Sequence, residues 1–208
     1  MKKIEFVDLI KHKLAGGDCP QELKGKYHPE IIARHLSMAF NHAVNRRFDA
    51  DAKRGMFDNL DAFTTTYSGI DVEYDKGRQE YYAIIPKSYM SLPKNRGVRL
   101  VYPDGSVENF FKYRENNRAT IMSNLDVDKI AEYVAFYIEN DRVYFAHLSP
   151  EYVEKVSIKL IPTFEALDDS EYVPIPAGYE KMLFDLVVES MMRQRPEKMS
   201  NDENSNTQ

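Results

Sequence analysis

The chain has 208 residues, of which 43% are hydrophobic and 29% are charged, so we expect one folded domain, or a domain with an insertion, and exclude global disorder. The formal net charge is −5 and no stretch is strongly basic, which argues against a dedicated nucleic-acid-binding arm. Apolar runs such as residues 133–138 are far shorter than the roughly 20 residues that span a bilayer. The single cysteine excludes an internal disulfide framework and a multi-cysteine zinc site.

Residues 1–62 are predicted to form an N-terminal helical part. Within residues 3–14, apolar side chains recur every three or four positions, which predicts an amphipathic helix. Pro29 suits the first turn of a second helix, and the apolar stripe that follows predicts that this helix ends near Phe48. A further short helix is predicted over residues 56–62.

Residues 63–165 are predicted to form an inserted β region, because short runs rich in Tyr, Val, Ile and Phe alternate with turn signals. The regular short spacing, without a long helical pattern, predicts an antiparallel sheet or a small barrel. Predicted turns are Asp75-Lys76-Gly77, Pro103-Asp104-Gly105 and Asn140-Asp141. The second of these gives the clearest hairpin signal, joining residues 98–102 to residues 107–113, and residues 153–161 are predicted to form a further strand.

Residues 166–198 begin with an acidic loop and are then predicted to form a helix that packs on the N-terminal helices. The polar residues 199–208 have no core-forming pattern, so we expect a tail that is flexible unless assembled. The predicted fold class is therefore α+β, with a helical base made from the N- and C-terminal helices and an inserted antiparallel sheet or barrel.

Candidate catalytic and metal-ligating residues are weak. His28, His35 and His42 recur every seven residues, but neighbours on one helix would lie about 10 Å apart along the axis, too far to share a metal. Cys19 lies in a predicted loop without a recognisable histidine partner. The chain has no phosphate-binding glycine loop, dinucleotide fingerprint or nucleophile elbow. We therefore expect no catalytic residue, no metal and no organic cofactor.

Two surfaces are candidates for binding. Residues 94–118 interleave Lys and Arg with aromatic residues, a pattern that nucleic-acid-binding sheets use, although acidic residues dilute it and strands also use aromatics for packing. The turn-flanked segment 86–97 carries apolar residues and leads into cations, which predicts contact with another subunit. The candidate contact residues are Tyr89, Met90, Leu92, Arg96 and Arg99. The alternative is that the apolar residues of this segment fold back onto the chain's own core.

Three stretches together resemble the head–tail connector proteins, also called ring or adaptor proteins, of crAss-like phages. The first is Tyr27-His28-Pro29-Glu30-Ile31-Ile32 leading into Ala39-Phe40-Asn41. The second joins Ile85-Pro86 to residues 91–99, and the third joins Val173-Pro174-Ile175-Pro176 to Gln194-Arg195-Pro196 and then Ser200-Asn201-Asp202. In order, these stretches span nearly the whole chain, and none is a catalytic signature.

The resemblance implies a structural virion protein at the head–tail junction, present in the host cytoplasm during assembly. Such proteins form a ring, commonly twelve-fold, below the portal protein, contact neighbouring neck and tail proteins, and extend the channel through which DNA is ejected without specific binding. No membrane is involved. Residues Ser200, Asn201 and Asp202 would belong to a tail that orders on assembly. The alternatives are another neck or tail hub component, a nucleic-acid-binding module that uses residues 94–118, and an enzyme with a site assembled from scattered residues.

Overall fold

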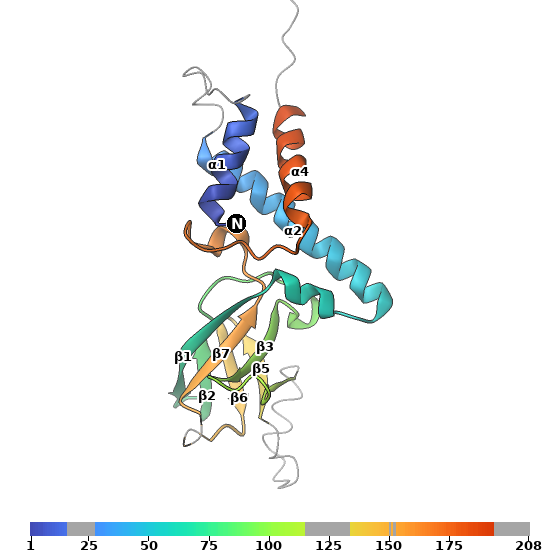
Figure 1. Cartoon of the computed structure of the whole chain (residues 1–208). Helices are drawn as coiled ribbons and strands as arrows, with labels where there is room; N and C mark the ends of the chain where they lie inside the picture. The colour runs from blue at the N-terminus through green and yellow to red at the C-terminus, as the bar shows by residue number, and fades with distance from the viewer. Residues whose placement is uncertain (16–27, 115–133, 150, 152, 194–208) are drawn as a thin grey trace, which may run out of the picture.

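The structure of the protein, a computed structural model, describes residues 1–15, 28–114, 134–149, 151 and 153–193. Within these residues, three α-helices lie at one end of the molecule, and a seven-stranded mixed sheet, nearly closed into a barrel, lies at the other (Figure 1). The predicted mixed α+β class is confirmed.

The three helices are α1 (Lys3–Leu14), α2 (Pro29–Arg54) and α4 (Tyr179–Arg193). Helix α1 has the predicted bounds, because its apolar spacing places Phe6, Val7, Ile10 and Leu14 on one buried face. The predicted end of α2 near Phe48 is wrong: the helix continues to Arg54, where Gly55 ends it in the left-handed region, at a φ of 68°.

Three short 3₁₀ helices are η2 (Asp58–Phe63), η3 (Pro93–Asn95) and η4 (Phe164–Ala166). Helix η2 takes the place of the short helix that was predicted over residues 56–62. Its Leu60 and Phe63 are fully buried beside α2, so this segment carries the chain from the helical part into the first strand.

The strands are β1 (Thr65–Asp75), β2 (Glu80–Ile84), β3 (Val98–Pro103), β4 (Lys112–Tyr113), β5 (Ala135–Glu139), β6 (Arg142–Ala146) and β7 (Lys155–Leu160). Their order in the sheet is β3-β7-β1-β2-β6-β5-β4. The predicted turns at Asp75-Lys76-Gly77 and Asn140-Asp141 join antiparallel hairpins β1–β2 and β5–β6. Strand β1 is bent at a bulge, where Gly69 has a φ of 72°, so that its first half pairs with β7 and its second half with β2.

The hairpin predicted across Pro103-Asp104-Gly105 is wrong. The turn forms, with Gly105 at a φ of 79°, but β3 pairs along its length with β7. After the turn, only β4 is extended, and it pairs in parallel with β5, so the sheet is mixed and not purely antiparallel. Long-range pairing with β7 overrides the local signal. The Phe111 N–H donates to the Val101 carbonyl oxygen at 2.7 Å, which joins the two edges of the sheet.

Two separate hydrophobic clusters hold the molecule together. The helical cluster combines buried residues of α1, α2, η2 and α4, such as Phe6, Phe40 and Leu183, and the barrel cluster fills the interior of the sheet with residues such as Phe145 and Ile158. Backbone hydrogen bonds from Lys3 and Ile4 to residues 169–171 tie the first turn of α1 to the segment before α4. In the described part of the chain, no helix combines the length and apolar character that crossing a membrane requires.

Candidate functional site

The segment of residues 86–97 lies between the two clusters. Met90 and Leu92 are buried in the helical cluster, and Tyr89 is half-buried against the barrel cluster. Met90 and Leu92 therefore fold back onto the chain's own core, as in the alternative, whereas Tyr89 stays partly exposed, and its contact with another subunit remains a prediction. The burial has a simple cause: the Met90 N–H donates to the Ile161 carbonyl oxygen at 2.9 Å, which holds the segment beside the end of β7.

Gly97 makes this packing possible. A β-carbon at this position would lie 1.9 Å from the Met90 carbonyl oxygen and 2.8 Å from the Tyr89 Cδ2 atom, closer than atoms approach. Just before it, Lys94 and Asn95 adopt positive φ angles of 58° and 52°, which is uncommon for residues other than glycine. The segment is thus tightly constrained, and it turns the cations that follow toward one side of the barrel.

Those cations line a pocket of about 320 Å³, which we call the basic pocket. Its lining residues are Lys94, Asn95, Arg96, Val98, Arg99, Tyr113 and Arg114. The Asn95 amide donates to the Tyr113 hydroxyl at 3.0 Å, and the Arg96 guanidinium lies 3.5 Å from the centre of the Phe57 ring. The pocket thus brings together Arg96 and Arg99, which the sequence analysis gave as candidate contact residues. It also contains Lys94 and Arg114, which belong to the basic stretch of residues 94–118.

Asp61 organises this side of the molecule. Its carboxylate accepts hydrogen bonds from Arg99 Nε at 2.8 Å and from Lys159 Nζ at 3.1 Å, and Arg99 also donates to the Phe57 carbonyl oxygen at 3.0 Å. Burial alone would raise the pKa of Asp61, but these hydrogen bonds outweigh it and hold that pKa below its usual value. Asp61 therefore joins η2 to β3 and β7, and it links the helical part to the barrel.

The chemistry that the basic pocket offers is anion binding. Burial and the neighbouring Arg99 charge lower the pKa of Arg96, because both disfavour its charged form. The Arg114 Nε atom is buried and has no hydrogen-bond partner among the described residues. The N–H donors of the lysine, arginine and asparagine side chains in the lining suit a phosphate or carboxylate oxygen.

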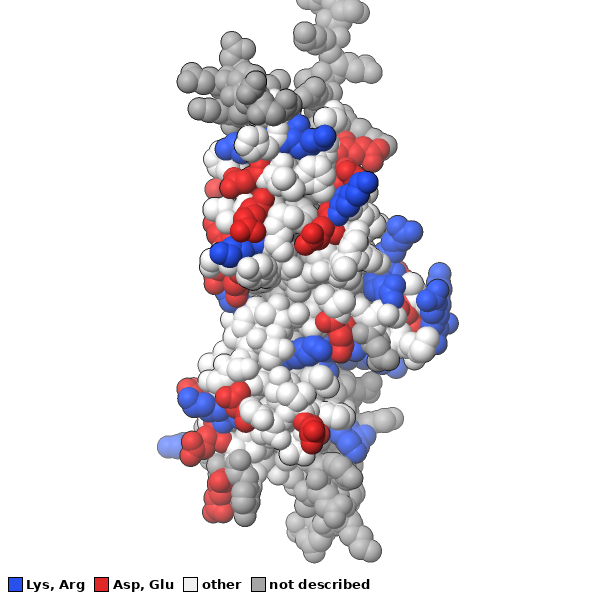
Figure 2. Space-filling model, in the orientation of Figure 1, with Lys and Arg blue, Asp and Glu red and all other residues white. Residues whose placement is uncertain are grey.

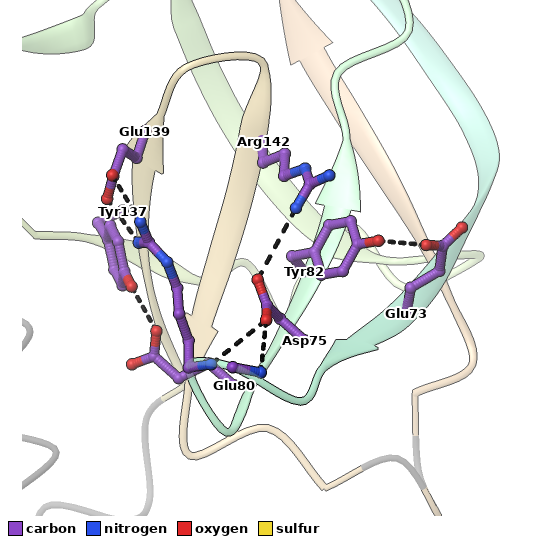
Figure 3. A network of polar contacts seen from close by, with 9 residues as sticks. Glu73, Asp75, Glu80, Tyr82, Tyr137, Glu139 and Arg142 are labelled. Atoms are coloured by element: carbon purple, nitrogen blue, oxygen red, sulfur yellow. Dashed lines mark hydrogen bonds and ion pairs between the residues drawn. The ribbon is translucent and has the colours of Figure 1, made fainter.

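A second polar cluster lies on the outer face of β2, β5 and β6, and the sequence reasoning missed it (Figure 3). Three tyrosines, Tyr82, Tyr137 and Tyr144, pack together there, with Tyr137 stacked on Tyr144 at 5.3 Å between ring centres. Figure 3 shows the Tyr82 hydroxyl donating to Glu73 and the Tyr137 hydroxyl donating to Glu80. Because the three tyrosines come from three different strands, no local sequence motif predicts the cluster.

Arginines cover this tyrosine cluster. Arg78 makes a two-pronged ion pair with Glu139, at 2.6 and 2.7 Å, and its guanidinium lies 4.6 Å from the centre of the Tyr144 ring. Arg142 lies 4.4 Å from the centre of the Tyr82 ring and pairs with Asp75 (Figure 3). Burial and the hydrogen bond to Glu80 raise the pKa of Tyr137. Both donating hydroxyls have a carboxylate acceptor, so the cluster acts as a structural cap of the sheet.

The third feature is the last part of α2. Among residues 45–54 of this helix, which we call the α2 arm, only Asp51 is buried. The arm extends away from the other helices, and Figure 2 shows Lys and Arg gathered on it. Within the described chain, Arg46, Lys53 and Arg54 have no carboxylate partner, whereas Arg47 pairs with Asp51 at 3.3 Å.

Between the α2 arm and the start of α4 lies a groove of about 630 Å³, which we call the α2–α4 groove. Its apolar lining comes from Ala43, Ala50, Ala177, Tyr179, Met182 and Leu186, and its polar lining from His42, Arg46 and Arg47. Leu186 remains 38% exposed there. A surface that combines apolar side chains with cations suits an acidic, amphipathic partner.

The histidines do not converge. His28 caps the N-terminus of α2, where its Nδ1 accepts from the Glu30 N–H at 3.4 Å, and His35 is buried against Ser190 at 3.2 Å, whereas His42 is exposed. Among the described residues, no three His, Cys, Asp or Glu side chains are placed to hold a metal ion. Cys19 and the predicted assembly tail Ser200, Asn201 and Asp202 lie outside the described residues.

Comparison with known proteins gives no assignment: no protein-family model matches the chain, and the search of curated proteins finds no match.

Proposed function

We propose that the protein is a structural subunit of a phage head–tail connector, which assembles into a ring below the portal and extends the DNA channel. The resemblance of residues 27–41, 85–99 and 173–202 to connector proteins of crAss-like phages motivates the proposal. The helices of the two chain ends would form the base of each subunit, and the sheet would be an insertion between them.

The α2 arm is the observation that carries the proposal. A helix needs tertiary packing for most of its stability, yet Asp51 is the one buried residue of the α2 arm, and Phe48 packs only partly buried against the helical cluster. It presents three exposed cations without carboxylate partners in the described chain, on the side of the molecule away from α1 (Figure 1, Figure 2). A neighbouring subunit on the arm would supply the missing contacts, and a contact between unlike surfaces can close a ring.

The test is the mass of the assembled protein. Native mass spectrometry of the purified chain, alone and with the portal protein, should give one closed oligomer of defined stoichiometry. Averaged images of the particle neck with a labelled copy of the chain should place it directly below the portal. A chain that stays monomeric in both conditions contradicts the proposal, and a label elsewhere in the neck or tail supports the alternative of another hub component.

The basic pocket favours a second candidate, a nucleic-acid-binding module. Four cations line it, and a pocket that neutralises phosphates binds DNA with an affinity that falls steeply with salt. Under this alternative, Arg114→Ala would weaken binding of a short DNA duplex and make its salt dependence shallower. Under the connector proposal, the wild type shows no measurable DNA affinity at physiological salt, because DNA must slide through the channel.

A further inference from the structure

Among the described residues, nothing packs on the outer face of α1, which exposes both apolar and acidic side chains. Ile4, Glu5, Asp8 and Leu9 are exposed on this face, opposite to the buried residues of the helix, and the exposed His12 follows them one turn later. The side chains of Ile4 and Leu9 remain 47% and 48% exposed. Within the described chain, the Asp8 carboxylate has no hydrogen-bond or ion-pair partner, and the Glu5 carboxylate accepts from the Lys2 N–H at the start of its own helix. We call this surface the α1 stripe.

The α1 stripe and the α2–α4 groove are complementary in chemistry. The stripe offers two exposed aliphatic side chains beside two carboxylates, and the groove offers Leu186, Met182 and Tyr179 beside Arg46. Helix-in-groove recognition uses this combination, in which apolar anchors enter the groove and flanking charges set the orientation. In the stripe, the apolar residues and the carboxylates all lie on α1, whereas in the groove the large apolar residues come from α4 and the cations from α2.

The two surfaces of one chain cannot meet each other. Helix α1 lies on one side of the helical part, and the α2 arm extends from the other (Figure 1). The buried face of α1 is already packed against its own core, so the α1 stripe faces outward. Contact between them therefore requires two copies, and because the surfaces differ, the contact is of the head-to-tail kind that generates rings.

We propose that the α1 stripe of one copy docks into the α2–α4 groove of the next copy of this chain. This deepens the proposed ring function, since it names the surfaces that would form the lateral contact. Leu9 would enter the groove beside Leu186, and Asp8 would approach Arg46. The occupant is a second copy because one chain carries both the stripe and the groove, with opposite charges on opposite sides.

Cross-linking between single-cysteine variants tests the contact. In a Cys19→Ser background, Leu9→Cys and Leu186→Cys are prepared separately, with an affinity tag on one of them, and oxidised alone or mixed. The mixture should give a disulfide-linked heterodimer, and neither variant alone should dimerise. A Leu9→Cys homodimer would show that α1 pairs with itself and would overturn the docking, and a mixture without heterodimer overturns it as well.

Charge reversal gives an independent readout. Asp8→Arg should weaken self-association about five- to tenfold, and Arg46→Glu in the same chain should restore it, because the reversed pair is again opposite in charge. Glu108→Arg and Lys76→Glu make the same charge changes at exposed sites outside both surfaces and should leave association unchanged. Circular dichroism checks that every variant is folded.

The outcomes separate the docking from the ring proposal. A wild type that forms a closed oligomer while the cysteine mixture gives no heterodimer keeps the ring and overturns this docking. If the cysteine mixture gives the heterodimer but the wild type never forms a closed oligomer, the docking holds and the ring proposal is contradicted. Failure of Arg46→Glu to restore association in the Asp8→Arg chain overturns the pairing of these two charges.

Discussion

Asp61 connects the helical part to the barrel, and replacing it by asparagine tests that role. The carboxylate holds Arg99, which is 12% exposed, and Lys159, which is 24% exposed, at 2.8 and 3.1 Å. Asparagine has nearly the same shape but no charge, and its single carbonyl oxygen cannot serve both cations. Asp61→Asn therefore leaves two half-buried cations without a counter-charge.

The size of the effect follows from the geometry. A hydrogen bond to a charged group contributes about 1.5–3 kcal/mol when it is shielded from water, and an exposed ion pair contributes about 0.2–1 kcal/mol. Asp61 itself is 38% exposed, which places its pairs between these limits. We expect Asp61→Asn to lower the free energy of unfolding of the wild type by about 2 kcal/mol. In a Lys159→Met background, which already lacks one of the two cations, the same substitution should lower it by about 1 kcal/mol.

The direction of the pKa shift of Asp61 determines how the effect of Asp61→Asn changes with pH. Because the pKa of Asp61 is lower in the folded chain than in the unfolded one, its ion pairs stabilise the fold above the usual carboxyl pKa of about 4. That stabilisation is lost as the pH falls through the lowered folded value. Urea unfolding followed by circular dichroism should therefore show a wide gap between wild type and Asp61→Asn at pH 7, and a narrower gap at pH 3.

The control is Asp71→Asn, which makes the same change at an exposed pair with Lys155, whose oxygen–nitrogen distance is 3.6 Å. It should lower the free energy of unfolding by less than about 0.5 kcal/mol. If Asp61→Asn behaves like this control, or if its gap from wild type is as wide at pH 3 as at pH 7, then Asp61 does not join the two parts electrostatically.

Three further substitutions test other parts of the fold. In thermal unfolding, Gly97→Ala should lower the free energy of unfolding by about 2–4 kcal/mol, because the new β-carbon meets the Met90 carbonyl oxygen. Gly77→Ala is the control: the atom nearest to its new β-carbon would be 3.3 Å away, so the free energy of unfolding should change little. Arg47→Ala should lower the free energy of unfolding in urea by about 2–4 kcal/mol, because the buried Asp51 carboxylate then keeps the Asn59 hydrogen bond but loses its cation. The exposed Arg46→Ala should leave it within about 0.5 kcal/mol, and equal effects would refute the role of the pair. Tyr137→Phe should lower it by about 1 kcal/mol, against nearly none for the exposed Tyr74→Phe. Because the pKa of Tyr137 is raised in the folded chain, its protonated hydroxyl stabilises the fold below pH about 10, and this stabilisation is lost at higher pH. An ultraviolet titration in which every tyrosine ionises at about pH 10 would contradict the assigned hydrogen bond.

Local patterns predicted the elements whose stability is local. The apolar spacing of residues 3–14 gave α1 its bounds, and the turns at residues 75–77 and 140–141 gave two hairpins, because spacing and turn chemistry act over a few residues. The end of α2 was missed because residues 49–54 have no apolar spacing, and only the left-handed Gly55 ends the helix. The hairpin after β3 was wrong because its competitor, β7, lies more than fifty residues further along the chain.

The candidate site was predicted in composition but not in geometry. The basic character of residues 94–114 is visible in the sequence, and four of these cations do line one pocket. Their organisers, Phe57, Asp61 and Lys159, lie far away in sequence, so no spacing rule could associate them with the pocket. Met90 and Leu92 were expected in an intersubunit contact because their exposure was inferred from flanking turns, whereas the close approach at Gly97 and the hydrogen bond to Ile161 place them in the core.

The proposed lateral contact has a consequence for the rest of the molecule. Both of its surfaces, the α1 stripe and the α2–α4 groove, belong to the helical part, so the contact leaves the barrel free of lateral packing. The barrel then needs its own means of staying rigid, and the capped tyrosine cluster on its outer face and the ion pairs of Asp61 at its junction provide it. The basic pocket, also on the barrel side, would remain open in the assembled ring. An anion bound in this pocket would therefore not come from the lateral neighbour.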